Sequence, residues 1–168
     1  MSRLLFILFG MLIFPMSVLS DNSSVKFIYS GFDFYIPGGA SIIGTKGGRE
    51  NFTFFRYGSN NGKEFLAFSD ISKDDTIEYG CDVQEFYAQL AGRSSSNSCS
   101  QSEIASFKKY FVGNSDTGEW SNTDFTSYYF SNNEHSFLFV FKDDKVIKID
   151  SDFMDKNELK RIISQYVD

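Results

Sequence analysis

The chain has 168 residues, of which 42% are hydrophobic, 18% aromatic and 23% charged, and its formal net charge at pH 7 is −6. This length excludes a large multidomain enzyme, and the negative charge excludes a generally basic nucleic-acid binder, so we expect no nucleic acid among its partners. The high apolar content indicates a chain that folds rather than a disordered tail.

Residues 1–20 have the pattern of a cleavable secretory signal peptide. Arg3 is the only charge, and an apolar run of about eleven residues from Leu4 to Phe14 follows it, which is shorter than the ~20 residues needed to cross a bilayer. Val18-Leu19-Ser20 supplies the small-x-small pattern that precedes cleavage, so the mature chain is expected to begin at Asp21. The alternative is a retained N-terminal anchor, which would need a longer apolar stretch.

The mature chain, residues 21–168, carries 22 acidic and 15 basic side chains, a net charge of −7. No second long apolar run follows, so we expect a soluble periplasmic or secreted protein with no stable membrane insertion after signal cleavage. The sequence shows no internal repeat and no linker long enough to separate two units. We therefore expect a single domain over residues 21–168.

Short β-strand patterns dominate the first part of the mature chain. Alternation of apolar residues predicts strands at residues 25–29, 32–36, 51–57 and 63–70. Residues 39–50 are predicted to form a glycine-rich connection. The sequence Ser59-Asn60-Asn61-Gly62 separates the last two strands and predicts a hairpin, because Asn and Gly both tolerate positive φ.

Three segments have helical periodicity, and each opens with an oxygen-bearing side chain followed three residues later by Glu. The first side chain can accept hydrogen bonds from unpaired amides, and the Glu can reach back to the start of the helix. The predicted helices begin at Asp82, Ser100 and Asp155 and end near Gly92, Gly113 and Val167.

Aromatic-rich alternation between the second and third helices predicts strands at 126–130, 136–142 and 145–150, with a tight turn at Asp143-Asp144. This order of elements predicts an α+β fold: a single compact domain of mostly antiparallel β-sheet, with two central helices and a C-terminal amphipathic helix packed on one face. We expect the helices to be segregated to one side of the sheet.

Cys81 and Cys99 are the two cysteines of the chain. In an oxidising compartment such a pair most often forms a disulfide, and here it would clamp together the starts of the two central helices. The spacing does not fit a CxxC redox motif, and no nearby histidine completes a zinc site. We therefore predict a structural bridge.

The parts of several catalytic sites are missing from the sequence. His135 is the one histidine, so an HExxH zinc site is impossible, and no serine lies in a GxSxG motif. Residues 39–46 place Thr before Lys, the reverse of a phosphate loop. Residues 150–155 lack the calcium-loop glycine, whereas 114–119 could offer oxygens to a weakly held cation. We expect a protein that is not an enzyme and has no cofactor and no metal.

The middle of the chain is acidic, with eight acidic and two basic residues between 64 and 103. Such a surface can steer a basic partner, or it can simply keep the protein soluble. A tryptophan outside any periodic apolar pattern can anchor an interface, although it can also cover the core from a loop. The candidate partner-binding residues are Asp74, Asp75, Glu78, Asp116, Glu119 and Trp120.

These observations favour a small exported binding protein, of the kind of a periplasmic inhibitor or immunity protein, that occludes a basic exported toxin or hydrolase. The alternative is an envelope accessory protein or carrier that binds a small apolar ligand in an aromatic-lined cavity. A hydrolase that uses carboxylates would require convergent acidic residues with one raised pKa in a cleft. A packed interior with a protruding acidic loop would favour the first hypothesis.

Overall fold

The computed structural model describes residues 23–48, 51–112 and 116–167. The predicted signal segment 1–20 and the predicted helix end at Gly113 lie outside these residues. The described chain forms β1 (Ser24–Tyr29), β2 (Phe32–Pro37), β3 (Ile42–Lys46), β4 (Phe52–Arg56), β5 (Phe65–Asp70), α1 (Val83–Leu90), α2 (Gln101–Phe107), the π-helix η1 (Lys108–Val112), β6 (Thr117–Ser121), β7 (Thr126–Ser131), β8 (Ser136–Lys142), β9 (Lys145–Ser151) and α3 (Lys156–Ile162).

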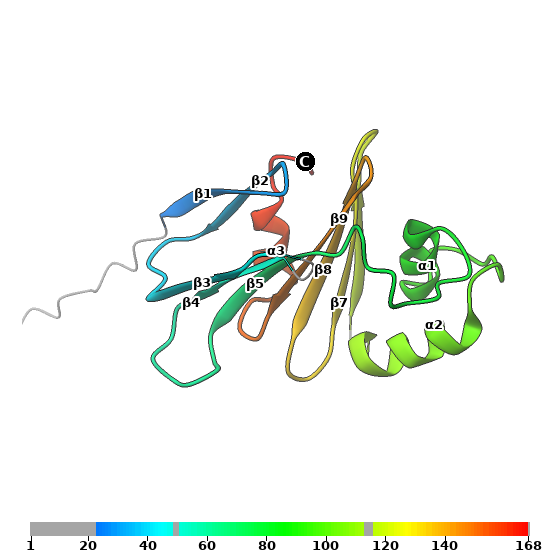
Figure 1. Cartoon of the computed structure of the whole chain (residues 1–168), viewed down its shortest axis with the longest axis horizontal. Helices are drawn as coiled ribbons and strands as arrows, with labels where there is room; N and C mark the ends of the chain where they lie inside the picture. The colour runs from blue at the N-terminus through cyan, green and yellow to red at the C-terminus, as the bar shows by residue number, and fades with distance from the viewer. Residues whose placement is uncertain (1–22, 49–50, 113–115, 168) are drawn as a thin grey trace, which may run out of the picture.

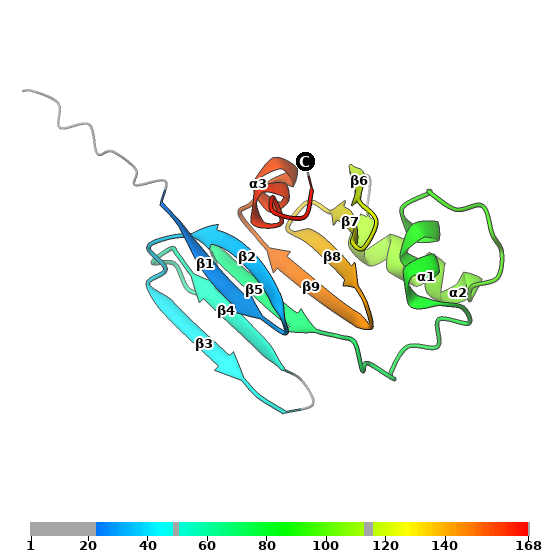
Figure 2. The same cartoon turned by 90° about the horizontal axis from the view of Figure 1, so that it is seen from above.

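Seven strands form one antiparallel sheet in the order β3-β4-β5-β9-β8-β7-β6, and β1 and β2 form a separate antiparallel hairpin. Figures 1 and 2 show the hairpin lying over the β4–β5 part of the sheet, while α1 and α2 lie at the other end of the molecule. The predicted α+β fold in a single domain is confirmed.

The expectation that the helices share one face of the sheet is wrong. Along β8, Phe137, Phe139 and Phe141 belong to the apolar cluster that contains α1 and α2. The alternating residues Leu138 and Val140 belong to a second cluster, which contains the β1–β2 hairpin and α3. Because β8 is apolar on both faces, each face needs its own cover, and the helices are divided between them.

Phe68 of β5 lies at the centre of the cluster under the hairpin, with none of its surface exposed. Its ring centroid is 5.0 Å from those of Phe27 and Phe34 on the hairpin. The third helix completes this layer, since Leu159 and Ile163 are also fully buried. The apolar stripe predicted for the C-terminal helix is confirmed at Leu159, but the helix ends at Ile162 rather than near Val167, and Ile163 follows it as the C-cap.

Tyr87 of α1 holds the opposite cluster together. Its ring centroid is 4.2 Å from that of Phe139 on β8, and 1% of its surface is exposed. Burial raises the pKa of its phenol well above the ordinary value. The first helix is thus fixed to the sheet through an aromatic ring rather than through an aliphatic stripe alone.

The capping prediction holds completely for one helix of three. At α3, Asp155 accepts a hydrogen bond from the amide of Glu158, and the Glu158 side chain accepts one from the Asp155 amide. At α1, Asp82 caps the helix, but the expected return contact from Glu85 is replaced by other partners. Ser100 makes no side-chain capping bond at α2.

Two strands were not predicted. β3 occupies part of the segment expected to be a connection, and β6 begins at Thr117, between the second predicted helix and the strand predicted at 126–130, where no strand was predicted. Each contains a glycine that weakens the strand pattern, and in each a side chain from another element takes the space of the missing Cβ: Phe54 over Gly44, and Lys156 over Gly118. Neither neighbour is visible in the local sequence.

Candidate partner-binding surface

Residues 71–82 form an irregular loop between β5 and α1 that is anchored along its length. Tyr79 is 8% exposed, and Ile71 and Ile77 pack against the same apolar cluster as α1. The Ile71 amide donates to the Val146 carbonyl at 3.0 Å, and the Ser100 amide donates to the Tyr79 carbonyl at 2.8 Å. The loop therefore has a fixed course, although it has no regular secondary structure.

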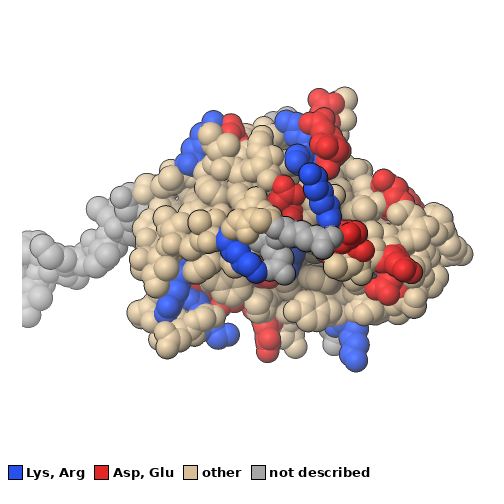
Figure 3. All heavy atoms as spheres, in the orientation of Figure 1, with Lys and Arg blue, Asp and Glu red and all other residues tan. Residues whose placement is uncertain are grey.

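Carboxylates project from the outer side of this loop. Asp75 and Glu78 are exposed, whereas Asp74 is half-buried and accepts hydrogen bonds from the Thr76 hydroxyl at 2.6 Å and the Thr76 amide at 3.0 Å. Figure 3 shows acidic side chains along the part of the surface where the loop runs toward the helices. Asp74 thus shapes the turn that presents the carboxylates of Asp75 and Glu78.

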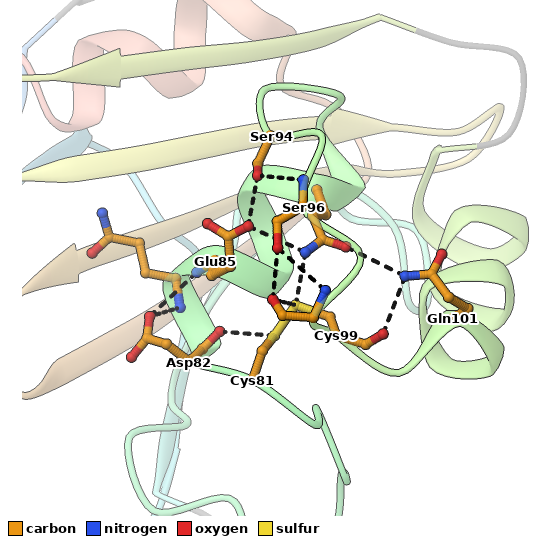
Figure 4. Close-up of a disulfide and its surroundings, with 10 residues drawn as sticks. Cys81, Asp82, Glu85, Ser94, Ser96, Cys99 and Gln101 are labelled. Carbon is orange, nitrogen blue, oxygen red and sulfur yellow. Dashed lines mark hydrogen bonds between the residues drawn. A yellow bond between two sulfur atoms is a disulfide. The ribbon is translucent and has the colours of Figure 1, made fainter.

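The predicted disulfide closes the far end of the loop. Cys81 and Cys99 are bonded, with their Cα atoms 4.8 Å apart, directly before the N-caps of α1 and α2. Figure 4 shows the bridge among polar side chains, where the Gln89 amide group donates to the Cys99 sulfur at 3.0 Å. The bridge fixes the position of residue 81 and hence the end of the acidic loop.

Glu85 has a structural role that the sequence did not reveal. It accepts hydrogen bonds from the Ser94 hydroxyl at 2.6 Å and from the Gln89 side chain at 3.1 Å. These two bonds lower the pKa of its carboxyl group, the Ser94 bond having the larger effect. Ser94 lies in the serine-rich linker between α1 and α2, so Glu85 ties this linker to the first helix.

A cleft of about 890 Å³ lies beside the start of the acidic loop. Most of the residues that line it are polar or charged, and they include Asp70, Asp74 and Asp75 as well as Lys73 and Lys145. The apolar side chains in the lining are Phe52 and Ile71. Such a lining suits a polar or charged group of a partner rather than a purely apolar ligand.

Asp70, in the lining of the cleft, is held by hydrogen bonds. Burial on its own would raise the pKa of its carboxyl group. The Ser30 hydroxyl, at 2.5 Å, and the Ser72 hydroxyl, at 2.6 Å, donate to its two oxygens. Together with the nearby charge of Lys145, these bonds outweigh burial and lower the pKa below its ordinary value of 3.8.

Replacing Ser30 with alanine is expected to raise the pKa of Asp70, because a donor to the charged carboxylate is lost. The lowered pKa stabilises the fold at neutral pH, and this contribution disappears as the pH falls below 3.8 and through the folded-state value. Carboxyl NMR titration of Asp70 measures the change directly. Ser41→Ala, which removes an exposed hydroxyl bonded to the Arg56 carbonyl, should leave the Asp70 pKa unchanged. A wild-type Asp70 pKa at or above 3.8 would contradict the assignment.

The other three predicted site residues lie around β6, which is separated from β5 by β9, β8 and β7 in the sheet. The Asp116 carboxylate is 2.6 Å from Lys156 Nζ, and that of Glu119 is 3.8 Å from Arg93 Nε. Trp120 is half-buried against Tyr129, with ring centroids 6.2 Å apart. The structure therefore places the six predicted residues in two groups rather than in one patch.

His135 belongs to a network that sequence reasoning missed. Its Nδ1 lies 2.9 Å from Asp150 Oδ1, and Asp150 Oδ2 lies 3.3 Å from Lys148 Nζ. The imidazole stacks on Phe137 with an interplanar angle of 9°. In the described part of the chain no hydroxyl or thiol is hydrogen-bonded to this ring, so its visible role is to join the β7–β8 turn to β9.

No protein-family model matches the chain. Searches of curated proteins and of solved structures likewise find no match. Within residues 23–48, 51–112 and 116–167, three or more His, Cys, Asp or Glu side chains never come together in a group that could hold a metal ion. None of the helices in the described residues has the length and apolar character needed to cross a membrane.

Proposed function

We propose that the protein is a small exported binding protein, without catalytic activity, that occludes a basic partner protein such as a secreted toxin or an envelope hydrolase. The acidic loop at residues 71–82 makes the main contact. Asp75 and Glu78 meet basic side chains of the partner, and the neighbouring cleft receives one of its projecting groups. An inhibitor or immunity protein works in this way, by covering the active region of its target.

The observation that carries this proposal is the anchoring of the loop. Tyr79 and two isoleucines fix its inner side, and the Cys81–Cys99 bridge fixes its end. A loop that is ordered before binding loses less conformational entropy on association, so more of the charge attraction appears as affinity. Charges arranged in this way also accelerate the encounter with a partner of opposite sign.

The lining of the cleft supports a protein partner over a small apolar ligand. A carrier for such a ligand needs an enclosed pocket lined by apolar side chains. Here the cleft beside the loop has three carboxylates and two lysines in its lining. The phenylalanines buried beneath α1 and beneath the β1–β2 hairpin pack against one another, as expected of a filled core.

The test is affinity capture from the protein's native extracellular or envelope fraction, using oxidised protein that begins at Asp21. We expect one stoichiometric basic protein, whose affinity can then be measured by calorimetry with the purified pair. Reversing both exposed loop charges, in Asp75→Lys/Glu78→Lys, should weaken binding by about 100-fold or more, as expected for two interfacial charges that become repulsive. Increasing salt should weaken the wild-type complex more than the variant complex.

Asp124→Lys/Glu134→Lys is the matched control, because both side chains are exposed in turns away from the loop and the change in net charge is the same. This control should retain most of the affinity. Equal weakening by the two double variants would show that overall charge, rather than the loop, attracts the partner. Capture of a lipid or another small apolar molecule without any protein would support the carrier hypothesis instead.

A further inference from the structure

The two edges of the seven-stranded sheet are protected to different degrees. At β6, Lys156 Nζ donates to the Thr117 carbonyl at 2.8 Å and pairs with Asp116, and its side chain covers Gly118. Charged side chains and covering groups of this kind prevent an edge strand from pairing with another chain. The β6 edge is therefore protected against pairing with a strand of another chain.

The β3 edge is protected less: within the residues that the structure describes, its one charged side chain is Lys46, at the end of the strand. Its five residues pair with β4 on one side, and Figure 2 shows β3 along the outer margin of the fold. Ile42 and Ile43 are 47% and 66% exposed, and they point to opposite faces because side chains alternate along a strand. A strand without Pro or bulge, and with isoleucine on both faces, is a template for β-strand addition.

The side chain of Phe54 adds a second feature at this edge. Phe54 pairs with Gly44 across β3 and β4, and a Cβ on Gly44 would overlap the phenyl ring. The ring therefore lies over the backbone of Gly44, at the middle of the edge strand. The ring is only half-buried there.

We propose that β3 pairs antiparallel with β3 of a second copy of this chain, about a two-fold axis that passes beside Gly44. With Gly44 at the axis, Ile43 of each copy lies opposite Thr45 of the other and Ile42 lies opposite Lys46, so each isoleucine packs against the aliphatic part of its cross-strand partner. Residues opposite each other in an antiparallel pair have Cα atoms about 4.5–5.5 Å apart. The two Phe54 rings each reach over their own Gly44, so their edges would approach each other across the two-fold axis, as in an aromatic pair.

The charges of β3 are compatible with this register. With Gly44 opposite Gly44, Lys46 of each copy lies opposite Ile42 of the other. The two Lys46 positions are then four residues apart along the strands, which is about 13 Å. This separation exceeds the screening length of about 8 Å at physiological ionic strength, so repulsion between the lysines is small. In a parallel pair with Gly44 beside Gly44, the two Lys46 residues would lie directly next to each other, and their charges would repel.

The pairing joins the two sheets into one continuous sheet and leaves the acidic loop accessible, since the loop follows β5 rather than β3. The contact is limited to one short strand and its flanking side chains. An interface of this size gives a weak dimer whose population depends on protein concentration. The inference is independent of the proposed binding function.

The test is sedimentation velocity of the mature oxidised protein from about 10 μM to about 1 mM, a range that covers weak association. We expect the weight-average sedimentation coefficient to rise from that of a monomer toward that of a dimer. Ile43→Lys should keep the protein monomeric throughout, because it places a charge at the edge. Ile28→Lys is the matched control: Ile28 is also 66% exposed, but it lies on β1 outside the sheet. It should dimerise like the wild type.

Amide hydrogen exchange provides a second measurement that does not depend on a variant. At high concentration the amides of β3 that point away from β4 should become protected, while those of β6 should not change. A wild-type protein that remains monomeric at about 1 mM would overturn the proposal. Loss of the dimer in Ile28→Lys with retention in Ile43→Lys would also overturn it, and so would concentration-dependent protection of β6 in place of β3.

Discussion

Replacing Phe68 with alanine is expected to lower the free energy of unfolding by about 4 kcal/mol, the cost typical of removing a large aromatic side chain from a filled core. The ring is fully buried on β5. Its centroid lies 5.0 Å from those of Phe27 and Phe34 and 6.1 Å from that of Phe55. The cavity would open between the hairpin and the sheet, where several rings lose their partner together.

Phe65→Ala on the same strand is the control for this prediction. Phe65 points to the other face of β5 and is half-buried, with its ring 5.6 Å from His135. Phe65→Ala should lower the free energy of unfolding by only about 1 kcal/mol, since much of the Phe65 side chain is already in water. Urea denaturation followed by Trp120 fluorescence measures both variants. Equal losses at the two positions would mean that the hairpin does not form a tightly packed layer over β5.

Elements whose signals are local were predicted well from the sequence. The β4–β5 hairpin follows from the Asn-Gly pair, and Gly62 does adopt a positive φ of 69°. The α3 capping box and the turn at Asp143 likewise depend on residues a few positions apart. In these cases hydrogen bonding and backbone freedom within the segment determine its conformation.

Features that depend on distant segments were not predictable in the same way. The apolar run in β8 shows that the strand is buried on both faces, but it does not say which helix covers which face. β3 is a strand because it pairs with β4, and the ring of Phe54 on β4 then fills the space beside Gly44. The sequence therefore predicts most of the elements but not how they are shared between the two layers.

The candidate site shows the same division. The charges of Asp74, Asp75 and Glu78 and their position near the disulfide are evident from the sequence. The fixed course of the loop is not, because it depends on Tyr79 and on contacts with Val146 and Ser100. The Ser30 hydroxyl that binds Asp70 lies 40 residues away in the chain, and the Asp150 partner of His135 lies 15 residues away, so no local pattern could have indicated these two contacts.

Removing the disulfide, in Cys81→Ala/Cys99→Ala, is expected to lower the free energy of unfolding by about 3 kcal/mol, as chain-entropy arguments give for a loop of this length. The two cysteines are separated by 18 positions. Without the bridge the unfolded chain gains conformations, and in the folded protein the end of the acidic loop loses its covalent link to the start of α2 and keeps the hydrogen bond from the Ser100 amide to the Tyr79 carbonyl. The loop should therefore become more mobile than the sheet beneath it.

Two measurements separate these effects. Denaturation of the wild type under reducing conditions should reproduce most of the loss of stability seen in the double variant. Any difference reports the packing of the Cys99 side chain, since this residue is only 4% exposed. Hydrogen exchange should accelerate at the amides of residues 71–82, while those of β8 and β9 exchange at rates that follow global stability. If the bridge were removed and the exchange of residues 71–82 did not change, the loop would be held by Tyr79 and its neighbours alone. The preorganisation attributed to the disulfide would then be wrong, and partner affinity should be insensitive to reduction.

If the disulfide does hold the loop, reduction should weaken partner binding even at temperatures where the protein remains folded, because ordering the loop then costs free energy at the moment of association.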